Sequence, residues 1–213
     1  MKRSEINNLL RSAAACFRDH HWALPPNPRW DVTDFGLGDW RRHGLVLVNL
    51  TAQPEYWEKL MYAQAGMVTP CHCHHRKKED IICRWGELTV RAWPAPPAEC
   101  DGTRFDLLLN GEPRPVTAGA PILLHAGERV TLPPFVFHEF VPAAPECILG
   151  EVSTANDDLH DNFFVAPDVG RFPQVEEDEP ALWRLVSDPD QDSGRAPIQP
   201  AGGFPGAGRA TAR

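Results

Sequence analysis

No run of about 18 apolar residues occurs in the sequence, so no segment has the length of a transmembrane helix. Positive charge is also scarce, because 21 Lys and Arg stand against 29 Asp and Glu, for a formal net charge of −8. Nucleic-acid surfaces need clustered Lys and Arg, so this balance argues against a nucleic-acid partner. The first residues, MKRSEINNLL, turn polar directly after a basic pair and lack the apolar core of a secretory signal. We therefore expect a cytoplasmic protein without a nucleic-acid or membrane partner.

Cysteine patterns typical of structural zinc are absent as well. The six cysteines are Cys16, Cys71, Cys73, Cys83, Cys100 and Cys147. None of these spacings is C-x-x-C, so a four-cysteine zinc site is not expected. In a cytoplasmic protein, we expect free thiols rather than disulfides.

The chain has 213 residues, 42% of them hydrophobic and 23% charged, as in a globular protein with one ordinary domain. Its beginning is predicted to be helical, since apolar residues recur at helical spacing from Ile6 to Phe17, with Ser4 as a plausible N-cap. The prolines of LPPNPRW end this helix. A second helix is expected at 54–64, PEYWEKLMYAQ, packed outside the sheet.

Short apolar runs separated by turn clusters extend from about Gly44 to Phe164, among them GLVLVNL, ELTVRAWP and CILGEVST. Many short strands at regular intervals predict a mainly β fold, an antiparallel barrel or sandwich. From 189 to 213, 14 of 25 residues are Gly, Pro or Ala, a composition typical of disorder. We expect a helical and loop segment at 1–43 packed on the barrel, a β domain at 44–188, and a disordered tail at 189–213.

The stretch CHCHHRKKED at 71–80 is the densest group of potential metal ligands. In an extended strand, His72 and His74 share one face, and Cys71 and Cys73 share the other. One metal ion cannot easily collect both pairs. Glu79 lies five residues beyond His74, so a turn or bulge must bring its carboxylate back toward the imidazoles.

Spacing around this cluster resembles the first motif of the cupin superfamily. The matching positions are Gly66, His72, His74, Glu79 and Gly86. The later stretch GERVTLPPFVFH resembles the second motif, with Gly127, Pro133 and His138, and departs from it at Phe135 and Pro142. Neither departure is a ligand position, so loop geometry rather than metal binding is affected.

The resemblance implies a single cupin β-barrel, with the N-terminal helix and short helices flanking it, and a metal site between its strands. The implied ligands are His72, His74, Glu79 and His138. Three imidazoles and one carboxylate leave positions of an octahedral ion open for water or substrate oxygens. This set suits one divalent ion: Mn, Fe, Co, Ni or Zn.

Longer blocks resemble the D-lyxose ketol-isomerase family of cupins over nearly all of residues 1–187. They are MKRSEIN, HCHHRKKEDIICRWGELTVR, GEVSTANDDLHDNFF and RFPQVEEDEP. The resemblance implies a metal-dependent isomerase of unphosphorylated sugars, interconverting D-lyxose with D-xylulose and D-mannose with D-fructose. It also implies Mn²⁺ as the usual ion and a homodimer.

Moving a sugar carbonyl between C1 and C2 needs a base and stabilisation of an enediolate. Lys77 fits the family pattern His-x-His-x-x-Lys-x-Glu and is a candidate proton donor or oxyanion partner. Two candidates remain for the base. Glu151 stands in an otherwise apolar strand, where a carboxylate is costly unless paired or facing a polar cavity. Glu176, or its neighbour Glu177, could instead reach over the mouth of the barrel.

Sugar contacts are expected from Asp161, with Asn162, and from the aromatic residues Trp85, Phe137 and Phe140. Asp161 could equally cap a turn, and at least one of the aromatic rings is expected to pack in the core. Two other functions fit the same motifs: a non-haem Fe(II) dioxygenase, or a metal- and sugar-binding cupin without turnover.

Overall fold

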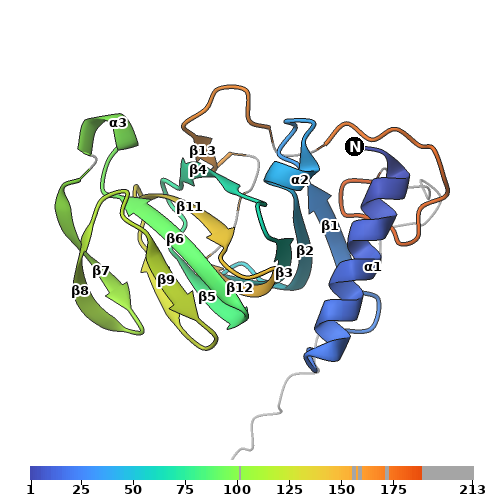
Figure 1. Cartoon of the computed structure of the whole chain (residues 1–213), viewed down its shortest axis with the longest axis horizontal. Coiled ribbons are helices and arrows are strands. Elements are labelled where there is room, and N and C mark those ends of the chain that lie inside the picture. The colour runs from blue at the N-terminus through green and yellow to red at the C-terminus, as the bar shows by residue number, and fades with distance from the viewer. Residues whose placement is uncertain (101, 155–156, 158–159, 171–172, 189–213) are drawn as a thin grey trace, which may run out of the picture.

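Two antiparallel β-sheets dominate the computed structural model (Figure 1), which describes residues 1–100, 102–154, 157, 160–170 and 173–188. The larger sheet has eight strands in the order β1-β2-β3-β12-β5-β10-β7-β8. In this order, their bounds are Arg29–Thr33, Leu45–Ala52, Tyr56–Gln64, Glu146–Thr154, Glu79–Trp85, Arg129–Leu132, Arg104–Leu109 and Glu112–Thr117.

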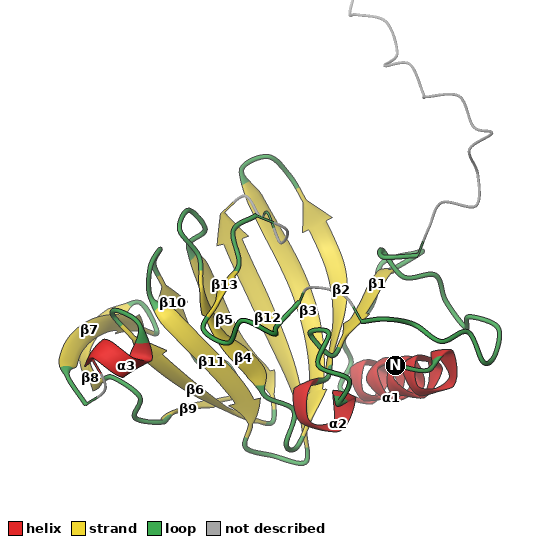
Figure 2. Ribbon diagram, turned by 90° about the horizontal axis from the view of Figure 1, so that it is seen from above, coloured by secondary structure: helices red, strands yellow, loops and turns green. Residues whose placement is uncertain are grey.

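The smaller sheet has five strands in the order β13-β4-β11-β6-β9. Their bounds are Phe163–Phe164, Thr69–Cys73, Phe137–Pro142, Glu87–Trp93 and Ile122–His125. The mainly β, antiparallel fold is therefore confirmed, but its strands form two separate sheets rather than one closed barrel in the described part of the chain. Figure 2 shows the curvature that brings the two sheets together.

Helix α1, Arg3–Asp19, covers the outer face of the large sheet beside β1 and β2 (Figures 1 and 2). The expected helical spacing is confirmed, since the ring of Phe17 packs against Trp30 and Tyr62. The expected N-cap is wrong: the N-cap is Lys2, and Ser4 instead hydrogen-bonds the carboxylate of Asp178. Two short helices, α2 (Trp40–His43) and α3 (Pro97–Cys100), complete the elements. Within the described residues, no helix is both long enough and apolar enough to cross a membrane.

The segment at 54–64 is not the predicted helix but forms β3, which pairs with β2 and β12. Leu60 and Tyr62 belong to the core shared with α1, whereas Lys59 and Met61 line a cavity on the other face. A strand buried on both faces reads as a continuous apolar run without simple alternation. That ambiguity between a buried strand and a helix explains the wrong assignment.

The C-terminal part of the described chain passes around α1, as the orange segment of Figure 1 shows. Arg3, only 3% exposed, donates hydrogen bonds to the carboxylates of Glu177 and Asp188. Trp183 stacks on Trp30 with ring centroids 5.1 Å apart. The tail expected at 189–213 lies outside the described residues.

Candidate metal centre

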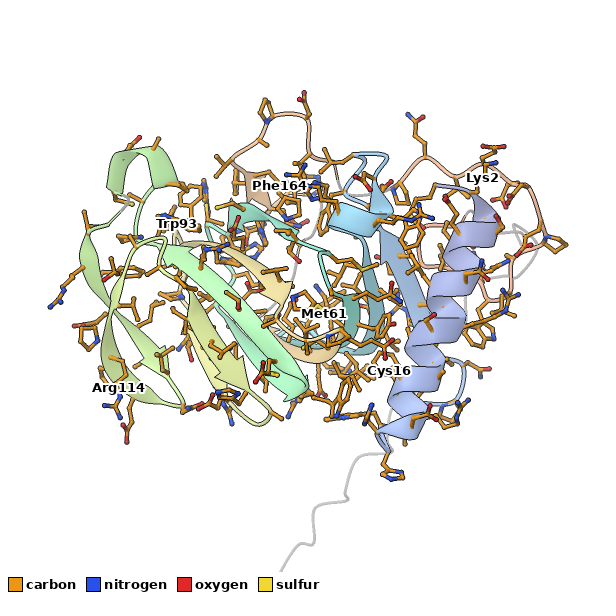
Figure 3. The ribbon with its side chains drawn as sticks, in the orientation of Figure 1. Lys2, Cys16, Met61, Trp93, Arg114 and Phe164 are labelled. Atoms are coloured by element: carbon orange, nitrogen blue, oxygen red, sulfur yellow. The ribbon has the colours of Figure 1, made fainter. Side chains whose placement is uncertain are left out.

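A cavity of about 530 Å³, including its opening to solvent, lies between the two sheets. Its walls combine charged and apolar side chains from both sheets. Met61 of β3 and Phe164 of β13, both labelled in Figure 3, lie on this lining. The cavity is therefore placed where side chains from β3, β4, β5, β11 and β12 can meet.

Four of the predicted metal ligands converge at this cavity: His72, His74, Glu79 and His138. One ligand atom from each lies within 4.8 Å of the others, and all four side chains are buried. His72 and His74 come from one face of β4 and its end, Glu79 begins β5, and His138 lies opposite His72 across the β4–β11 pairing. The polar loop at 74–78 supplies the expected change of direction between the histidines and the glutamate.

Hydrogen bonds identify which nitrogen of each imidazole can bind a metal ion. Each Nδ1 lies beside a backbone carbonyl oxygen: His72 to Pro70 at 2.8 Å, His74 to Asp161 at 2.7 Å and His138 to Val136 at 3.0 Å. A carbonyl oxygen only accepts, so Nδ1 carries the proton and Nε2 presents a lone pair. This carbonyl contact is the usual way in which proteins orient metal-binding histidines.

The Nε2 atoms of His74 and His138 are buried and have no hydrogen-bond partner in the described part of the chain. They lie 3.4 Å and 2.9 Å from Oε1 of Glu79, which also carries lone pairs. Acceptors facing one another at these distances repel unless a cation lies among them. The donor set therefore fits a divalent metal ion.

The protonation states of the ligands agree with metal binding. Burial, followed by the neighbouring imidazoles of His138 and His74, lowers the pKa of His72 well below its ordinary value, which keeps this imidazole neutral. Burial acts to raise the pKa of Glu79, but the ammonium group of Lys77 and the adjacent imidazoles outweigh it and hold that pKa well below the ordinary value. Glu79 is therefore an anion.

Lys77 and Glu151 also line the cavity, beside the metal ligands. The Nζ atom of Lys77 lies 2.6 Å from Oε2 of Glu79 and 3.2 Å from Oε1 of Glu151. All three side chains are at most 7% exposed. The structure thus brings together two of the predicted catalytic residues and the predicted ligands.

A third charged residue of the cavity, Lys59, was not predicted from the sequence. It lies directly opposite Glu151 in the β3–β12 pairing, and its Nζ is 3.3 Å from Oε1 of that carboxylate. On a helix packed outside the sheet, a lysine within YWEKLMYA can face solvent. Only if the segment is a strand is this lysine buried, and a buried lysine is a candidate functional residue. The wrong assignment of this segment to a helix therefore also concealed Lys59.

The alternative base, Glu176, is outside the cavity. Its backbone pairs with Lys2, and its carbonyl oxygen accepts the N–H of Arg3 at 2.8 Å. The side chain of Glu177 binds Arg3. The structure therefore uses this acidic segment to hold the start of α1 and leaves Glu151 as the acid beside the metal ligands.

Asp161 has a backbone-binding role rather than a place in the cavity lining. Its carboxylate accepts hydrogen bonds from the backbone N–H groups of His75, Arg76 and Lys77 at 2.9–3.2 Å. Burial acts to raise the pKa of Asp161, but these three donors outweigh it and hold the pKa below its ordinary value. Asp161 thus fixes the loop that carries Lys77.

The other residues expected to contact the sugar, Asn162 and the three aromatic residues, divide between two locations. Phe140 and Asn162 line the cavity, but Trp85 and Phe137 do not. Trp85 stacks on His20, with ring centroids 3.6 Å apart, and Phe137 packs against the small cluster around Trp93. The two aromatic residues outside the cavity, Trp85 and Phe137, therefore have packing roles.

The cysteines next to the ligands lie apart from the metal cluster, as the alternation of the strand predicts. Cys71 packs against the small cluster around Trp93, and neither Cys71 nor Cys73 lines the cavity. All six cysteines are free thiols. Burial raises the pKa of Cys71 to about 12 and that of Cys73 to about 11, so both remain neutral.

Two antiparallel sheets with a buried cluster of three histidines and one glutamate between them define a metal-binding cupin. A family model described as D-lyxose isomerase matches residues 27–189, and the chain belongs to this family of sugar isomerases.

Similar proteins agree with this assignment. The chain is 36% identical to a D-lyxose/D-mannose isomerase of Escherichia coli O157:H7, with 88% of this chain and 98% of that protein covered. It is 40% identical to a D-lyxose/D-mannose isomerase of Serratia proteamaculans, over 73% of each chain. The solved structure of Cellulomonas parahominis L-ribose isomerase with L-ribose has a TM-score of 0.59 at 21% identity, covering 82% of this chain and 98% of that one. This last likeness concerns the fold alone.

Proposed function

We propose that this protein is a metal-dependent aldose–ketose isomerase that interconverts D-lyxose with D-xylulose and D-mannose with D-fructose. The carrying observation is the carboxylate of Glu151, which lies between the ammonium groups of Lys59 and Lys77 in the cavity of the metal ligands. Membership of the D-lyxose isomerase family supports the substrate class. The names of the bacterial relatives support the two sugar pairs.

Isomerisation of an open-chain aldose requires removal of the proton on C2 and delivery of a proton to C1. In our proposal, Glu151 removes the first proton, passes through its carboxylic acid form and returns the proton to C1. Its position on β12, opposite Lys59, keeps the carboxylate in the cavity rather than in solvent. An ionised carboxylate is needed for the first step, and the Nζ atoms of Lys59 and Lys77 contact this carboxylate at 3.3 Å and 3.2 Å.

Lys77 is the proposed proton donor to the oxygen on C1 and hydrogen-bond partner of the oxygen on C2. It protonates O1 as the C2 proton leaves, and it regains a proton from the O2 hydroxyl group as C1 is protonated, so its ammonium form is restored. Its Nζ already contacts both Glu79 and Glu151, so a sugar held there would meet the base and the donor together. Lys59 holds Glu151 in position through their ion pair. Asp161 acts indirectly, because its hydrogen bonds to the loop fix the backbone of Lys77.

His72, His74, Glu79 and His138 are the proposed ligands of one divalent ion. When bound, this ion would act as a Lewis acid on the C1–C2 oxygens and offset the negative charge of the enediolate. We infer Mn²⁺ from the family resemblance, and the same donor set accepts Co, Ni, Fe or Zn. The resemblance also supports a homodimer in the cytoplasm, and the dimer is testable by light scattering.

Reloading with metal tests the function. Protein stripped with a chelator is divided and loaded with Mn²⁺, Fe²⁺ or no metal, and ketose formation is followed from D-lyxose and D-mannose. We expect turnover with Mn²⁺ and none without metal. Absence of turnover from both sugars, in protein shown to contain metal, would refute the isomerase assignment. Oxygen uptake by the Fe²⁺ sample would then point to a dioxygenase.

A further inference from the structure

Phe35 lines part of the cavity, although in the sequence it lies outside both histidine motifs. Its side chain is 7% exposed and lies on the cavity lining. Its ring meets Phe164 edge-on at 6.0 Å between centroids, and Phe164 in turn lies 5.3 Å from the ring of the metal ligand His72. Phe35 is thus separated from the metal cluster by one aromatic ring.

An unusual backbone conformation places Phe35 there. The backbone N–H of Leu37 donates to the carbonyl oxygen of Asp34 at 3.1 Å, which closes a four-residue turn. Its two central residues have positive φ angles, 55° at Phe35 and 72° at Gly36. This is the pattern of a type I′ turn, whose first central position favours Asn, Asp or Gly. A bulky phenylalanine there carries a steric cost.

Several buried hydrogen bonds hold the turn in this conformation. The carboxylate of Asp34, which is 1% exposed, accepts the N–H groups of Gly36 and Gly38 at 3.0 Å and 3.1 Å. Thr33 Oγ1 accepts the N–H of Phe35 at 2.8 Å, and the carbonyl oxygen of Phe35 accepts the N–H of Gly170 at 2.7 Å. A strained residue fixed by its surroundings at a binding cavity points to a functional constraint.

Phe35 belongs to an apolar part of the cavity wall that cannot hydrogen-bond a hydroxyl group. This apolar part of the wall also contains Leu45, Leu47, Met61, Phe140 and Phe164. In the proposed isomerase, the C1–C2 edge of the sugar is held by the metal ligands, Lys77 and Glu151. The far end of the sugar must then approach the remaining wall. A hydroxyl group buried there without a partner is disfavoured.

We propose that Phe35 limits the length of the sugar chain and so sets the preference for a pentose over the corresponding hexose. D-mannose repeats the configuration of D-lyxose at C2 to C4 and carries one additional hydroxymethyl group, on C5. Phe35, held by the turn, occupies the space that this extension needs. This inference rests on the proposed isomerase function and adds the residue that selects among its substrates.

The test compares kcat/KM for D-mannose with that for D-lyxose in the wild type, Phe35→Asn and Phe35→Ala. Asn suits a left-handed turn position and removes the ring, so this variant keeps the turn while it opens the cavity. We expect the mannose-to-lyxose ratio to rise by about tenfold, the usual scale for one added carbon in a pocket. A ratio unchanged within about twofold in both variants would overturn the proposal.

A matched control is Phe135→Asn. Phe135 also has a positive φ, 67°, but is 56% exposed and lies outside the cavity lining. This control should leave the ratio unchanged. If it shifts the ratio as much as Phe35→Asn does, the effect comes from altered turns rather than from the cavity, and the proposal fails.

Binding without turnover separates this inference from the isomerase assignment. The alditols obtained by reducing D-lyxose and D-mannose have no carbonyl group, and their affinities can be measured by calorimetry. We expect Phe35→Asn to raise the affinity for the hexitol relative to the pentitol. That shift would support the length limit even if the wild type isomerised neither sugar. Equal losses of affinity for both alditols would show that Phe35 only supports the structure.

Discussion

The ammonium group of Lys77 lies 2.6 Å from Oε2 of Glu79, whereas Oε1 of the same carboxylate faces the imidazoles of His74 and His138. One oxygen of the Glu79 carboxylate thus contacts Lys77, and the other faces the histidines of the candidate metal cluster. Because the same Nζ is 3.2 Å from Glu151, Lys77 joins the ligand set to the proposed base. Its proposed role in proton transfer can be tested separately from metal binding, because Lys77 contacts Oε2 of Glu79 whereas the imidazoles face Oε1.

Lys77→Met should retain the metal and lower kcat by about 10²–10⁴, the scale of a lost general acid or base. Metal content measured by mass spectrometry checks the first part, and steady-state kinetics check the second. Lys78→Met is the matched control, because Lys78 is exposed and outside the cavity. Loss of bound metal in Lys77→Met would mean that this lysine maintains the ligand geometry, contrary to the role assigned here.

Glu151→Gln should strongly slow proton transfer at C2 while the metal remains bound. In deuterium oxide, the wild type should incorporate deuterium during isomerisation, and Glu151→Gln should slow both isomerisation and exchange by about 10² or more. NMR of the recovered sugar measures the exchange. Glu176→Gln serves as control and should behave as wild type, because Glu176 is exposed and lies outside the cavity lining. The reverse result would transfer the role of base to Glu176.

Lys59→Met tests whether this lysine acts through Glu151. In the wild-type background, loss of the 3.3 Å ion pair should reduce kcat, by about tenfold or more for a misplaced catalytic group. In a Glu151→Gln background, the same change should have a much smaller effect, since contacting groups are not additive. Equal effects in the two backgrounds would indicate that Lys59 contributes independently of Glu151.

Asp161→Asn should lower the free energy of unfolding, and the size of this decrease should depend on pH. Three backbone donors favour the carboxylate, so its replacement should cost about 1–3 kcal/mol at neutral pH. The folded-state pKa of Asp161 lies below the ordinary value, so its stabilisation is fully present above that value and is lost as the pH falls through the folded pKa.

Thermal unfolding of wild type and Asp161→Asn at several pH values measures this difference. The gap should be full near neutrality and narrow below about pH 4. Asp157→Asn, which removes a partly exposed carboxylate paired with Arg76, should lower the free energy of unfolding by less than Asp161→Asn does. A gap that widens toward acid would show that protonated Asp161 is the stabilising form.

Local spacing together with the family resemblance predicted the candidate metal ligands. His72 and His74 alternate on one strand, and Glu79 follows within the same short stretch, so few backbone conformations can separate them. The ligand His138 was identified by the second motif, which resembles the family. The mainly β fold followed from the many short apolar runs. These features depend on residues close in sequence or on a repeated pattern of side chains.

Pairing between distant segments decided the rest. Only the β3–β12 register sets Lys59 opposite Glu151, 92 residues away. Only the docking of 174–188 on the start of α1 explains why Glu176 lies outside the cavity of the candidate metal ligands. Likewise, the roles of Asp161 and Phe35 depend on which backbone or cavity each side chain meets. The sequence by itself therefore determined the fold class and predicted the candidate metal ligands. The tertiary structure decided which other groups surround them, because strand register and loop docking are set by long-range packing.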